Sequence, residues 1–318
     1  MKIVLLDTFT MGSDMNFKCI EALGETVIYG NTSPDEVAER IKDADVAVLN
    51  KVVLDEKVLK TAKNLKLICV FAIGYNNIDI EYCKANGIKV RNVPGYCSAS
   101  VCQHTFALLF SLIENMRYYD DFVKDGLYSA SGIANHLAKR FFEIEGKKWG
   151  IIGMGSIGRR VADCAAAFGA DVCYSSISGA VREENYPAVP LNTLLSECDI
   201  ITVHAPLNEK THHLIGEKEL KMMKKTAVIV NVGRGSVIDE TALANAIDND
   251  IIGGAALDVY GEEPPKADSP IMNIKNKEKI VYTPHIAWGS VQARERCISM
   301  TADNIRAYID GKSHNDVI

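Results

Sequence analysis

The sequence lacks the features that mark several other classes of protein. No uninterrupted apolar run is long enough to cross a bilayer, which excludes a membrane-spanning protein. Its formal net charge of -6 and pI near 5.7, with no cluster of Lys and Arg along one expected face, argue against a nucleic-acid partner. The nine cysteines form no C-x-x-C pair and no regular spacing, so we expect buried thiols and no metal site. No apolar segment with a small-residue cleavage site follows Met1, which predicts a cytoplasmic protein without an export signal.

What is present is the composition of a large globular chain. Its 318 residues are 47% hydrophobic and 24% charged, which is enough to build two domains with apolar cores. Short apolar or β-branched runs alternate with segments of helical spacing, the pattern of parallel β-α-β units. We therefore expect an α/β fold of two Rossmann-like, doubly wound parallel-sheet domains, the first of them flavodoxin-like. The expected strands are residues 3–6, 26–29, 46–49, 67–71 and 89–93, and then 148–152, 171–174, 200–204, 227–232, 253–259 and 280–283.

Helical periods indicate where one domain gives way to the other. A long amphipathic stretch from Ser98 to Ile113 follows the breaker pair Pro94-Gly95, and residues 290–309 form a second such stretch, expected to return to the first domain. Residues 118–145 are polar and aromatic, and no local structure can be assigned to them. The long helix and this aromatic stretch are expected to pair two subunits into a homodimer. The expected domain ranges are residues 1–98 with 288–318, a discontinuous domain, and residues 99–287, the inserted one.

A glycine-rich turn stands between an expected strand and an expected helix. Residues 153–158 read GMGSIG, which matches G-x-G-x-x-G in that context. Gly153 permits a tight turn, Gly155 lets the backbone approach a pyrophosphate, and Gly158 allows close packing of helix on strand. A dinucleotide diphosphate would bind the free N–H groups where the helix starts, at Ser156 and Ile157. A glycine-rich turn without a ligand is the alternative interpretation.

The next expected strand ends without the acidic residue that usually binds the ribose of NAD. Ser175, Ser176 and Ser178 stand there instead. Without a carboxylate nothing repels a 2′-phosphate, and serine hydroxyls can donate hydrogen bonds to one. No Arg follows at once to require the phosphate, so NAD and NADP both stay open. A simple polar turn is the other interpretation of these serines.

Chemically useful side chains follow three later strands, at the sheet edge where open α/β folds bind ligands. Arg234, between two glycines, can present a planar guanidinium to a carboxylate. His285 can give a proton to a carbonyl oxygen and take it back, and an ionised Glu263 would stabilise its charged form. Glu262 is the alternative partner of His285. Together these groups predict interconversion of a 2-oxo acid and a 2-hydroxy acid. The three segments are residues 232–235, 258–264 and 283–288.

Taken in order along the chain, these and other motifs resemble one family. The sequence is similar to the D-isomer-specific 2-hydroxyacid dehydrogenases, and within them to the glycerate dehydrogenase and hydroxypyruvate reductase branch. The similarity covers nearly the whole chain, and the set of motifs is specific when it occurs in this order. Besides the segments above, the motifs are residues 71–79 (FAIGYNNID), 100–109 (SVCQHTFALL) and 204–207 (HAPL).

The resemblance implies roles that the residues alone do not assign. It implies that Arg234 binds substrate, that Glu263 pairs with His285, and that main-chain amides of Ile73 and Gly74 hold the substrate carboxylate. Further substrate contacts that it implies are Lys51, beside Asn50, and Trp288. The implied coenzyme contacts outside the glycine turn and the serines are Thr105, His204, Ala205, Pro206, Val232, Gly233, His285, and Asp258 on the nicotinamide carboxamide.

The resemblance thus implies an NAD(P)-dependent D-2-hydroxyacid dehydrogenase that moves a hydride between nicotinamide and C2 of a small acid. Hydroxypyruvate and glyoxylate, giving glycerate and glycolate, are the expected substrates, and a cleft between the domains is the expected site. A formate or phosphite dehydrogenase and a dinucleotide-sensing regulator on the same fold are the alternatives. A sensor would not need Arg234, Glu263 and His285 together. Gln103 departs from the Glu that many relatives carry, without touching the chemistry.

Overall fold

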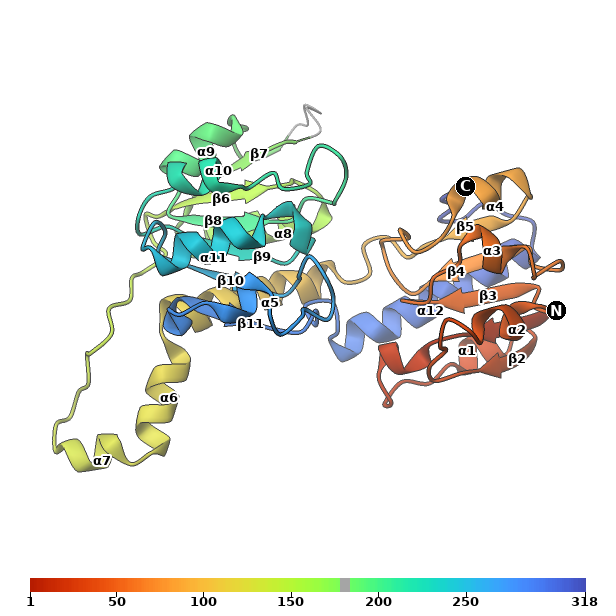
Figure 1. Ribbon diagram of the computed structural model, residues 1–318, viewed down its shortest axis with the longest axis horizontal. Helices are drawn as coiled ribbons and strands as arrows, with labels where there is room; N and C mark the ends of the chain where they lie inside the picture. Colours follow the sequence, from red (N-terminus) through yellow and green to blue (C-terminus); the bar gives the residue numbers. More distant parts are fainter. Residues whose placement is uncertain (178–183) are drawn as a thin grey trace. The chain divides into compact units, whose positions relative to one another are not determined.

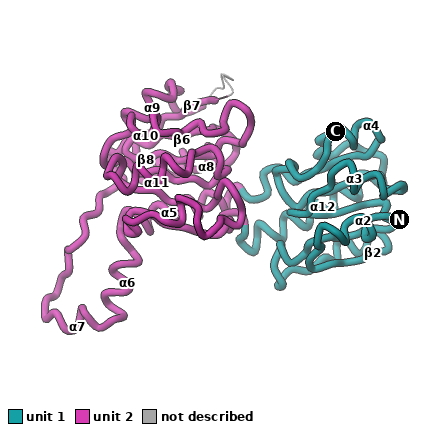
Figure 2. The backbone as a smooth tube through the Cα atoms, in the orientation of Figure 1, with its two compact units in different colours: residues 1–97, 289–318 teal, residues 98–288 magenta. Residues whose placement is uncertain are grey.

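The computed structural model describes residues 1–177 and 184–318, which divide into two compact units (Figure 1 and Figure 2). Unit 1 contains Met1–Cys97 and Gly289–Ile318, and unit 2 contains Ser98–Trp288. Each unit is built around one sheet whose paired strands all run parallel. The α/β fold of two parallel sheets predicted from the sequence is therefore confirmed. Among the described residues, no helix combines the length and the apolar character needed to span a membrane.

The sheet of unit 1 has five strands in the order β2-β1-β3-β4-β5. The chain turns from β1 to β2 on one side and then to β3 on the other, which is the flavodoxin-like order. All four residues of β3 and of β4 are buried, as expected for central strands of a parallel sheet that is covered on both faces. The strands are β1 (Lys2–Leu5), β2 (Glu25–Ile28), β3 (Val46–Leu49), β4 (Leu67–Val70) and β5 (Lys89–Arg91).

The helices of unit 1 are short, except for the last one. Helix α12 (Val291–Ile309) starts at Ser290, whose hydroxyl accepts a hydrogen bond from Ala293 N at 3.3 Å. It packs against α1 and β4, so the end of the chain joins the unit formed by its beginning. The other helices are α1 (Lys18–Glu21), α2 (Val37–Ile41), α3 (Glu56–Leu59), α4 (Ile80–Ala85) and the 3₁₀ helix η1 (Thr8–Met11).

A buried guanidinium fastens the C-terminal segment to the sheet. Arg91, at the end of β5, donates to Asn304 O at 2.6 Å and to Lys312 O at 2.7 Å, and its Nε lies 2.6 Å from Asp316 Oδ1. A buried cation needs such partners because it would otherwise lose its hydration without compensation. These bonds therefore fix the segment that follows α12 on unit 1.

The sheet of unit 2 has six strands in the order β11-β10-β9-β8-β6-β7. From β6 the chain goes to β7 on one side and to β8 on the other, so the strand order reverses between β6 and β8. An isolated parallel bridge between Tyr174 and Ala188 extends the sheet beyond β7. In open α/β sheets the carboxyl ends at such a reversal border the ligand-binding crevice. The strands are β6 (Lys148–Ile152), β7 (Asp171–Ser175), β8 (Ile200–Val203), β9 (Val228–Asn231), β10 (Gly254–Leu257) and β11 (Ile280–Tyr282).

Helices pack on the sheet of unit 2 around a fully buried tryptophan. Trp149 of β6 donates from Nε1 to Thr202 Oγ1 at 3.2 Å, and its ring centroid lies 5.2 Å from that of Phe106. Phe106 belongs to α5 (Ser98–Ile113), the long helix predicted from the sequence. The remaining helices of the body are α8 (Ser156–Ala167), α9 (Leu191–Glu197), α10 (Glu217–Met222), α11 (Glu240–Asp248), and the 3₁₀ helices η2 (Gly235–Val237), η3 (Pro270–Asn273) and η4 (Lys277–Lys279).

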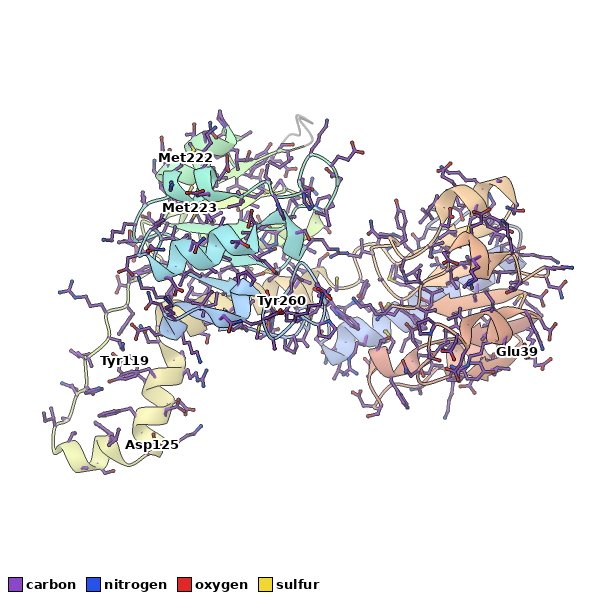
Figure 3. All side chains as sticks on the ribbon, viewed as in Figure 1. Glu39, Tyr119, Asp125, Met222, Met223 and Tyr260 are labelled. Atoms are coloured by element: carbon purple, nitrogen blue, oxygen red, sulfur yellow. The ribbon has the colours of Figure 1, made fainter. Side chains whose placement is uncertain are left out.

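Residues 116–145, which we call the arm, leave the body of unit 2 through α6 and α7 and return to it, where Lys139 pairs with Glu278 and Ile144 is buried (Figure 1). The arm contains α6 (Met116–Lys124) and α7 (Leu127–Ser131), in which no residue is buried. Figure 3 labels Tyr119 and Asp125 on it. The ring of Phe122 stacks on that of His136 with centroids 3.8 Å apart, so the returning chain is held against α6. The sequence could not assign this stretch because its helices bury no side chain in the core of the unit, which is what helical spacing usually reports.

Candidate active site

Three glycines shape the turn at the carboxyl end of β6. Gly153 has a φ of 97°, and a Cβ there would lie 2.8 Å from Ala205 N. A Cβ at Gly158 would lie 2.3 Å from Gly153 O, so neither position accepts a side chain. At Gly155 a Cβ would meet no atom within 4 Å, so the backbone borders open space. The outer glycines thus serve close packing, and the middle one leaves access to the backbone.

Helix α8 begins directly after this turn. Its N-cap is Gly155, which has no side chain to accept from the first-turn amides of Ser156 and Ile157. Unsatisfied N–H groups and the positive end of the helix dipole attract anions. The twelve-residue α8 therefore offers a phosphate-binding end at the point where the strand order reverses.

A cavity of about 610 Å³ lies against the turn, within the size range of small-ligand sites. Its walls come from the carboxyl ends of β6, β7 and β8 and from the segment after β8. Lys210 and Thr211 lie on the wall that this segment forms. The coenzyme contacts expected from the sequence that line the cavity are Gly153, Gly155, Ser176, His204, Ala205 and Pro206.

The serines after β7 differ in their surroundings. Ser176 lines the cavity, whereas Ser175 is buried, and its carbonyl accepts a hydrogen bond from Gly153 N at 3.2 Å. Ser178 lies outside the described residues. Ser176 is therefore the described serine that can meet a ligand in this cavity.

His204 supplies the polar group of the cavity whose bonding is incomplete. Both of its ring nitrogens are buried, and neither has a hydrogen-bond partner in the described part of the chain. Burial lowers the pKa of His204 to about 3, so the imidazole is neutral at physiological pH. A buried polar atom without a partner costs free energy unless a ligand or water satisfies it. Together with the glycine cradle, this histidine fits a bound nicotinamide dinucleotide.

Other expected coenzyme contacts serve the packing around the cavity. The Thr105 hydroxyl is fully buried in α5, where it donates to Val101 O at 2.8 Å. A Cβ at Gly233 would lie 3.0 Å from Ala205 O, so this glycine lets the segment after β9 approach the cavity wall. Val232, beside it, is buried.

Arg234 is held in a turn after β9 by a buried asparagine. Asn231 Nδ2 donates to Arg234 O at 3.0 Å, and Asn231 Oδ1 accepts from Gly233 N at 3.0 Å. A Cβ at Gly235 would lie 1.8 Å from the carbonyl carbon of Tyr260, so the two backbones touch. The turn that carries Arg234 is thereby pressed against the segment that follows β10.

Glu263 and His285 form a hydrogen-bonded pair. His285 Nδ1 lies 2.5 Å from Glu263 Oε2, and Tyr260 N donates to Glu263 Oε1 at 3.2 Å. Glu262 instead lies 2.9 Å from Lys266 Nζ at the exposed surface. The structure therefore pairs His285 with Glu263, on the edge formed by β9, β10 and β11, which are neighbours in the sheet.

The buried carboxylate of Asp258 holds the backbone around His285. It accepts hydrogen bonds from Ile286 N at 2.8 Å and Ala287 N at 2.9 Å, and Asp258 O accepts from His285 N at 2.8 Å. His285 has a φ of 55°, in the left-handed region that side chains other than glycine rarely occupy. Such a conformation persists only where its surroundings impose it. Asp258 supplies that constraint.

The expected substrate contacts of unit 1 follow β3 and β4. A buried aspartate, Asp7, accepts hydrogen bonds from the main-chain N–H groups of residues 50–52, including Lys51 N at 2.6 Å. Burial raises the pKa of Asp7, although these bonds act in the opposite direction. Asn92 Nδ2 donates to Ile73 O at 2.7 Å, which holds the turn that continues into Gly74. The remaining expected substrate contact, Trp288, belongs to the other unit, as the last residue of unit 2.

Several residues that build these sites escaped the sequence analysis. Asp7, Asn92 and Asn231 are polar side chains at strand ends: the first two bond main-chain groups of other segments, and Asn231 bonds the turn that follows its own strand. Only their position after apolar strands could have drawn attention to them. Gly235 gave a signal, because a second glycine flanks Arg234 in the sequence.

Comparisons with known proteins agree with this geometry. The family description "D-isomer specific 2-hydroxyacid dehydrogenase, NAD binding domain" matches residues 106–287. Over 323 aligned residues the chain is 34% identical to a hydroxypyruvate reductase of Blautia hydrogenotrophica, covering 100% of this chain and 99% of that protein.

Two solved structures are similar over almost the full length. An acyclic imino acid reductase in complex with NADPH and D-arginine has a TM-score of 0.88 and 29% identity, with 100% of both chains covered. The D-lactate dehydrogenase of Aquifex aeolicus, complexed with NAD and lactic acid, has a TM-score of 0.86 and 27% identity, with 99% of this chain and 98% of that chain covered. The resemblance drawn from the motifs is thereby confirmed, and the chain belongs to the D-isomer specific 2-hydroxyacid dehydrogenase family.

Proposed function

We propose that this protein is an NAD(P)-dependent D-2-hydroxyacid dehydrogenase that reduces small 2-oxo acids, above all hydroxypyruvate and glyoxylate. Family membership gives the reaction class and the use of a nicotinamide coenzyme. The observation that carries the proposal for this chain is the His285–Glu263 pair, 2.5 Å apart, beside the turn of Arg234. The similarity to a hydroxypyruvate reductase over the whole length supports the choice of substrate.

The chain's own residues supply the proton and the anion-binding group, while the bound coenzyme supplies the hydride. Because Nδ1 of His285 faces Glu263, Nε2 is the nitrogen that holds the proton for the carbonyl oxygen. Glu263 orients the ring and stabilises its charged form. Arg234 Nη1 donates to Gly233 O at 2.8 Å, which orients the guanidinium as it binds the substrate carboxylate.

Further contacts remain part of the proposal. We propose that the main-chain amides of Ile73 and Gly74, and the side chains of Lys51 and Trp288, bind the substrate. Unit 2 would then be the coenzyme-binding domain and unit 1 the substrate-binding domain. For Thr105 and Asp258, whose polar groups are bonded within unit 2, the hydrogen bonds support a structural contribution beside any contact with coenzyme.

Coenzyme choice rests on the cavity near Ser176, since a hydroxyl stands there where a carboxylate would repel a 2′-phosphate. We propose that both NADH and NADPH are accepted.

A cytoplasmic location is also proposed, because nine free thiols, two pairs of them with sulfurs 3.6 and 3.7 Å apart, suit a reducing compartment.

Steady-state kinetics across a short substrate series tests the proposed function. With NADH and with NADPH, we expect turnover of hydroxypyruvate and glyoxylate, D-glycerate as the product of the former, and no oxidation of formate or phosphite. Loss of absorbance at the nicotinamide band measures the rate, and chiral chromatography identifies the isomer. Coenzyme binding without any turnover would point instead to a sensor.

Replacing His285 with Asn should lower kcat by roughly 10²- to 10⁴-fold, the usual contribution of general acid catalysis. Asn tolerates the left-handed backbone of this position, so the loop keeps its shape. Glu263→Gln should lower kcat by a smaller factor, whereas the neighbouring Glu262→Gln, which alters an exposed pair with Lys266, should leave it unchanged. Equal losses at Glu262 and Glu263, or an intact kcat in His285→Asn, would refute the assignment.

His204 should make the coenzyme-free protein sensitive to acid. The pKa of His204 is about 3 when folded and 6.5 as an ordinary histidine, so the unfolded chain binds the extra proton as pH falls below 6.5. Stability is then lost on acidification, by about 2 kcal/mol for this group between pH 7 and pH 5. Urea unfolding at both pH values should show that His204→Gln loses about that much less than the wild type. An identical loss in the two proteins would contradict the neutral, buried imidazole.

We also propose that the arm pairs two copies of the chain. Its exposed apolar side chains, such as Ile133 at 66% and Leu137 at 79%, support this because an apolar patch of that kind is rarely left in water. Light scattering at assay concentration should give twice the chain mass of 34.8 kDa. Leu137→Asp should shift the protein toward monomer, and Val53→Asp, at an exposed apolar residue of unit 1, should not. A monomeric wild type would refute the proposal.

A further inference from the structure

Three side chains hold Thr283, two residues before His285. Its carbonyl accepts from Tyr260 Oη at 3.0 Å, and its hydroxyl donates to Asp258 Oδ1 at 2.6 Å. His104 Nε2 lies 3.0 Å from the same hydroxyl. Burial raises the pKa of Tyr260 to about 12, so its hydroxyl stays a donor. These contacts fix the position of Thr283, directly after β11.

The direction of these bonds follows from the chemistry of the groups. Both carboxylate oxygens of Asp258 accept main-chain N–H groups, and a carboxylate has no hydrogen to donate. The single hydroxyl proton of Thr283 therefore points to Asp258. In its contact with His104 the Thr283 hydroxyl must then accept, so His104 Nε2 carries the hydrogen.

These hydrogen bonds continue from Thr283 through Asp258 to the backbone next to His285. Asp258, only 1% exposed, bonds Thr283 on one side and the N–H groups of Ile286 and Ala287 on the other. His104 Nε2 also lies 3.6 Å from Asp258 Oδ1, so its hydrogen faces the buried negative charge. A chain of hydrogen bonds thus runs from α5 to the loop in which His285 is held at a φ of 55°.

We infer that His104 and Thr283 are positioning residues that fix Asp258, and through it the loop that presents His285. This inference rests on the proposed role of His285 as acid and base. Neither residue lines the coenzyme cavity, and their side chains bond each other and Asp258, so their effect on His285 passes through the loop. A fixed ring matters because small displacements of a catalytic group lower its rate steeply.

Ser111, on the same helix as His104, provides a matched control. Ser111, His104 and Tyr282 all line a second cavity of unit 2, of about 690 Å³. Ser111→Ala changes that cavity without removing a member of the hydrogen-bond chain. We expect it to keep the wild-type kcat, so any effect of the cavity itself is separated from an effect of the chain.

Steady-state kinetics of four variants tests the inference. Thr283→Val keeps the shape but removes the hydroxyl, and should lower kcat for hydroxypyruvate by roughly tenfold to a hundredfold, as for a lost hydrogen bond to a charged group. Thr283→Ser should restore most of it. His104→Leu should lower kcat and His104→Gln, whose amide can donate in place of Nε2, should restore it. The coenzyme dissociation constant should stay within twofold in all four folded variants.

A spectroscopic measurement tests the same chain without turnover. Two-bond ¹⁵N–¹H correlation spectra of the histidine-labelled protein, assigned with His104→Gln, should show hydrogen on Nε2 of His104. Hydrogen on Nδ1 alone would overturn the inference. So would a wild-type kcat in both Thr283→Val and His104→Leu.

The outcomes separate this inference from the proposed function. If His285→Asn abolishes turnover while Thr283→Val and His104→Leu keep it, the positioning role is refuted and the acid–base assignment stands. If His285→Asn keeps its turnover, the acid–base assignment itself is refuted. A loss of kcat in Thr283→Val that Thr283→Ser fails to restore also counts against the positioning role.

Discussion

The parallel direction of all strands in each sheet is the constraint on which the rest of the structure depends. Parallel strands bring their carboxyl ends to one edge, and each strand there passes into a loop with free main-chain groups. In unit 2 this edge gathers the glycine turn after β6, His204 after β8, and Arg234, Glu263 and His285 after β9, β10 and β11. The sheet thereby places residues that are far apart in the sequence along one edge.

Close backbone contacts and buried polar groups convert that edge into defined sites. Gly153, Gly158 and Gly235 each stand where a Cβ would overlap another backbone. Asn231 and Asp258 then hold the loops by hydrogen bonds to their main-chain groups. The close packing brings the loops together and the polar groups orient them, so the side chains at this edge keep defined positions.

Much of the fold could be predicted from the sequence because its signals are local. The eleven strands found in residues 1–177 and 184–318 overlap the ranges expected from apolar runs, and α5 spans the predicted amphipathic stretch. The glycine pattern located the turn after β6, since G-x-G-x-x-G between a strand and a helix has one common structural meaning. Family resemblance pointed to Glu263 rather than Glu262, a choice that spacing did not explain and that the hydrogen bond to His285 accounts for.

What the sequence could not give are effects that act between distant segments. No residue of α6 or α7 in the arm is buried, so these helices do not pack on the core of their own unit, and a local pattern cannot show what they pack on. The resemblance implies that Thr105 contacts the coenzyme, yet its hydroxyl donates to Val101 O within α5. His104 lies in the motif of residues 100–109, and its hydrogen bond to Thr283 becomes visible only when α5 is laid against the end of β11.

Both units hold a loop through a buried aspartate that binds main-chain N–H groups, Asp7 for residues 50–52 and Asp258 for residues 286 and 287. Every amino acid except proline brings such an N–H group, whatever side chain it carries. Lys51 and Ile286 can therefore be exchanged without moving the loops that bear them. Selection for a new acid, in nature or in the laboratory, can vary what these loops display while the two aspartates keep the framework constant.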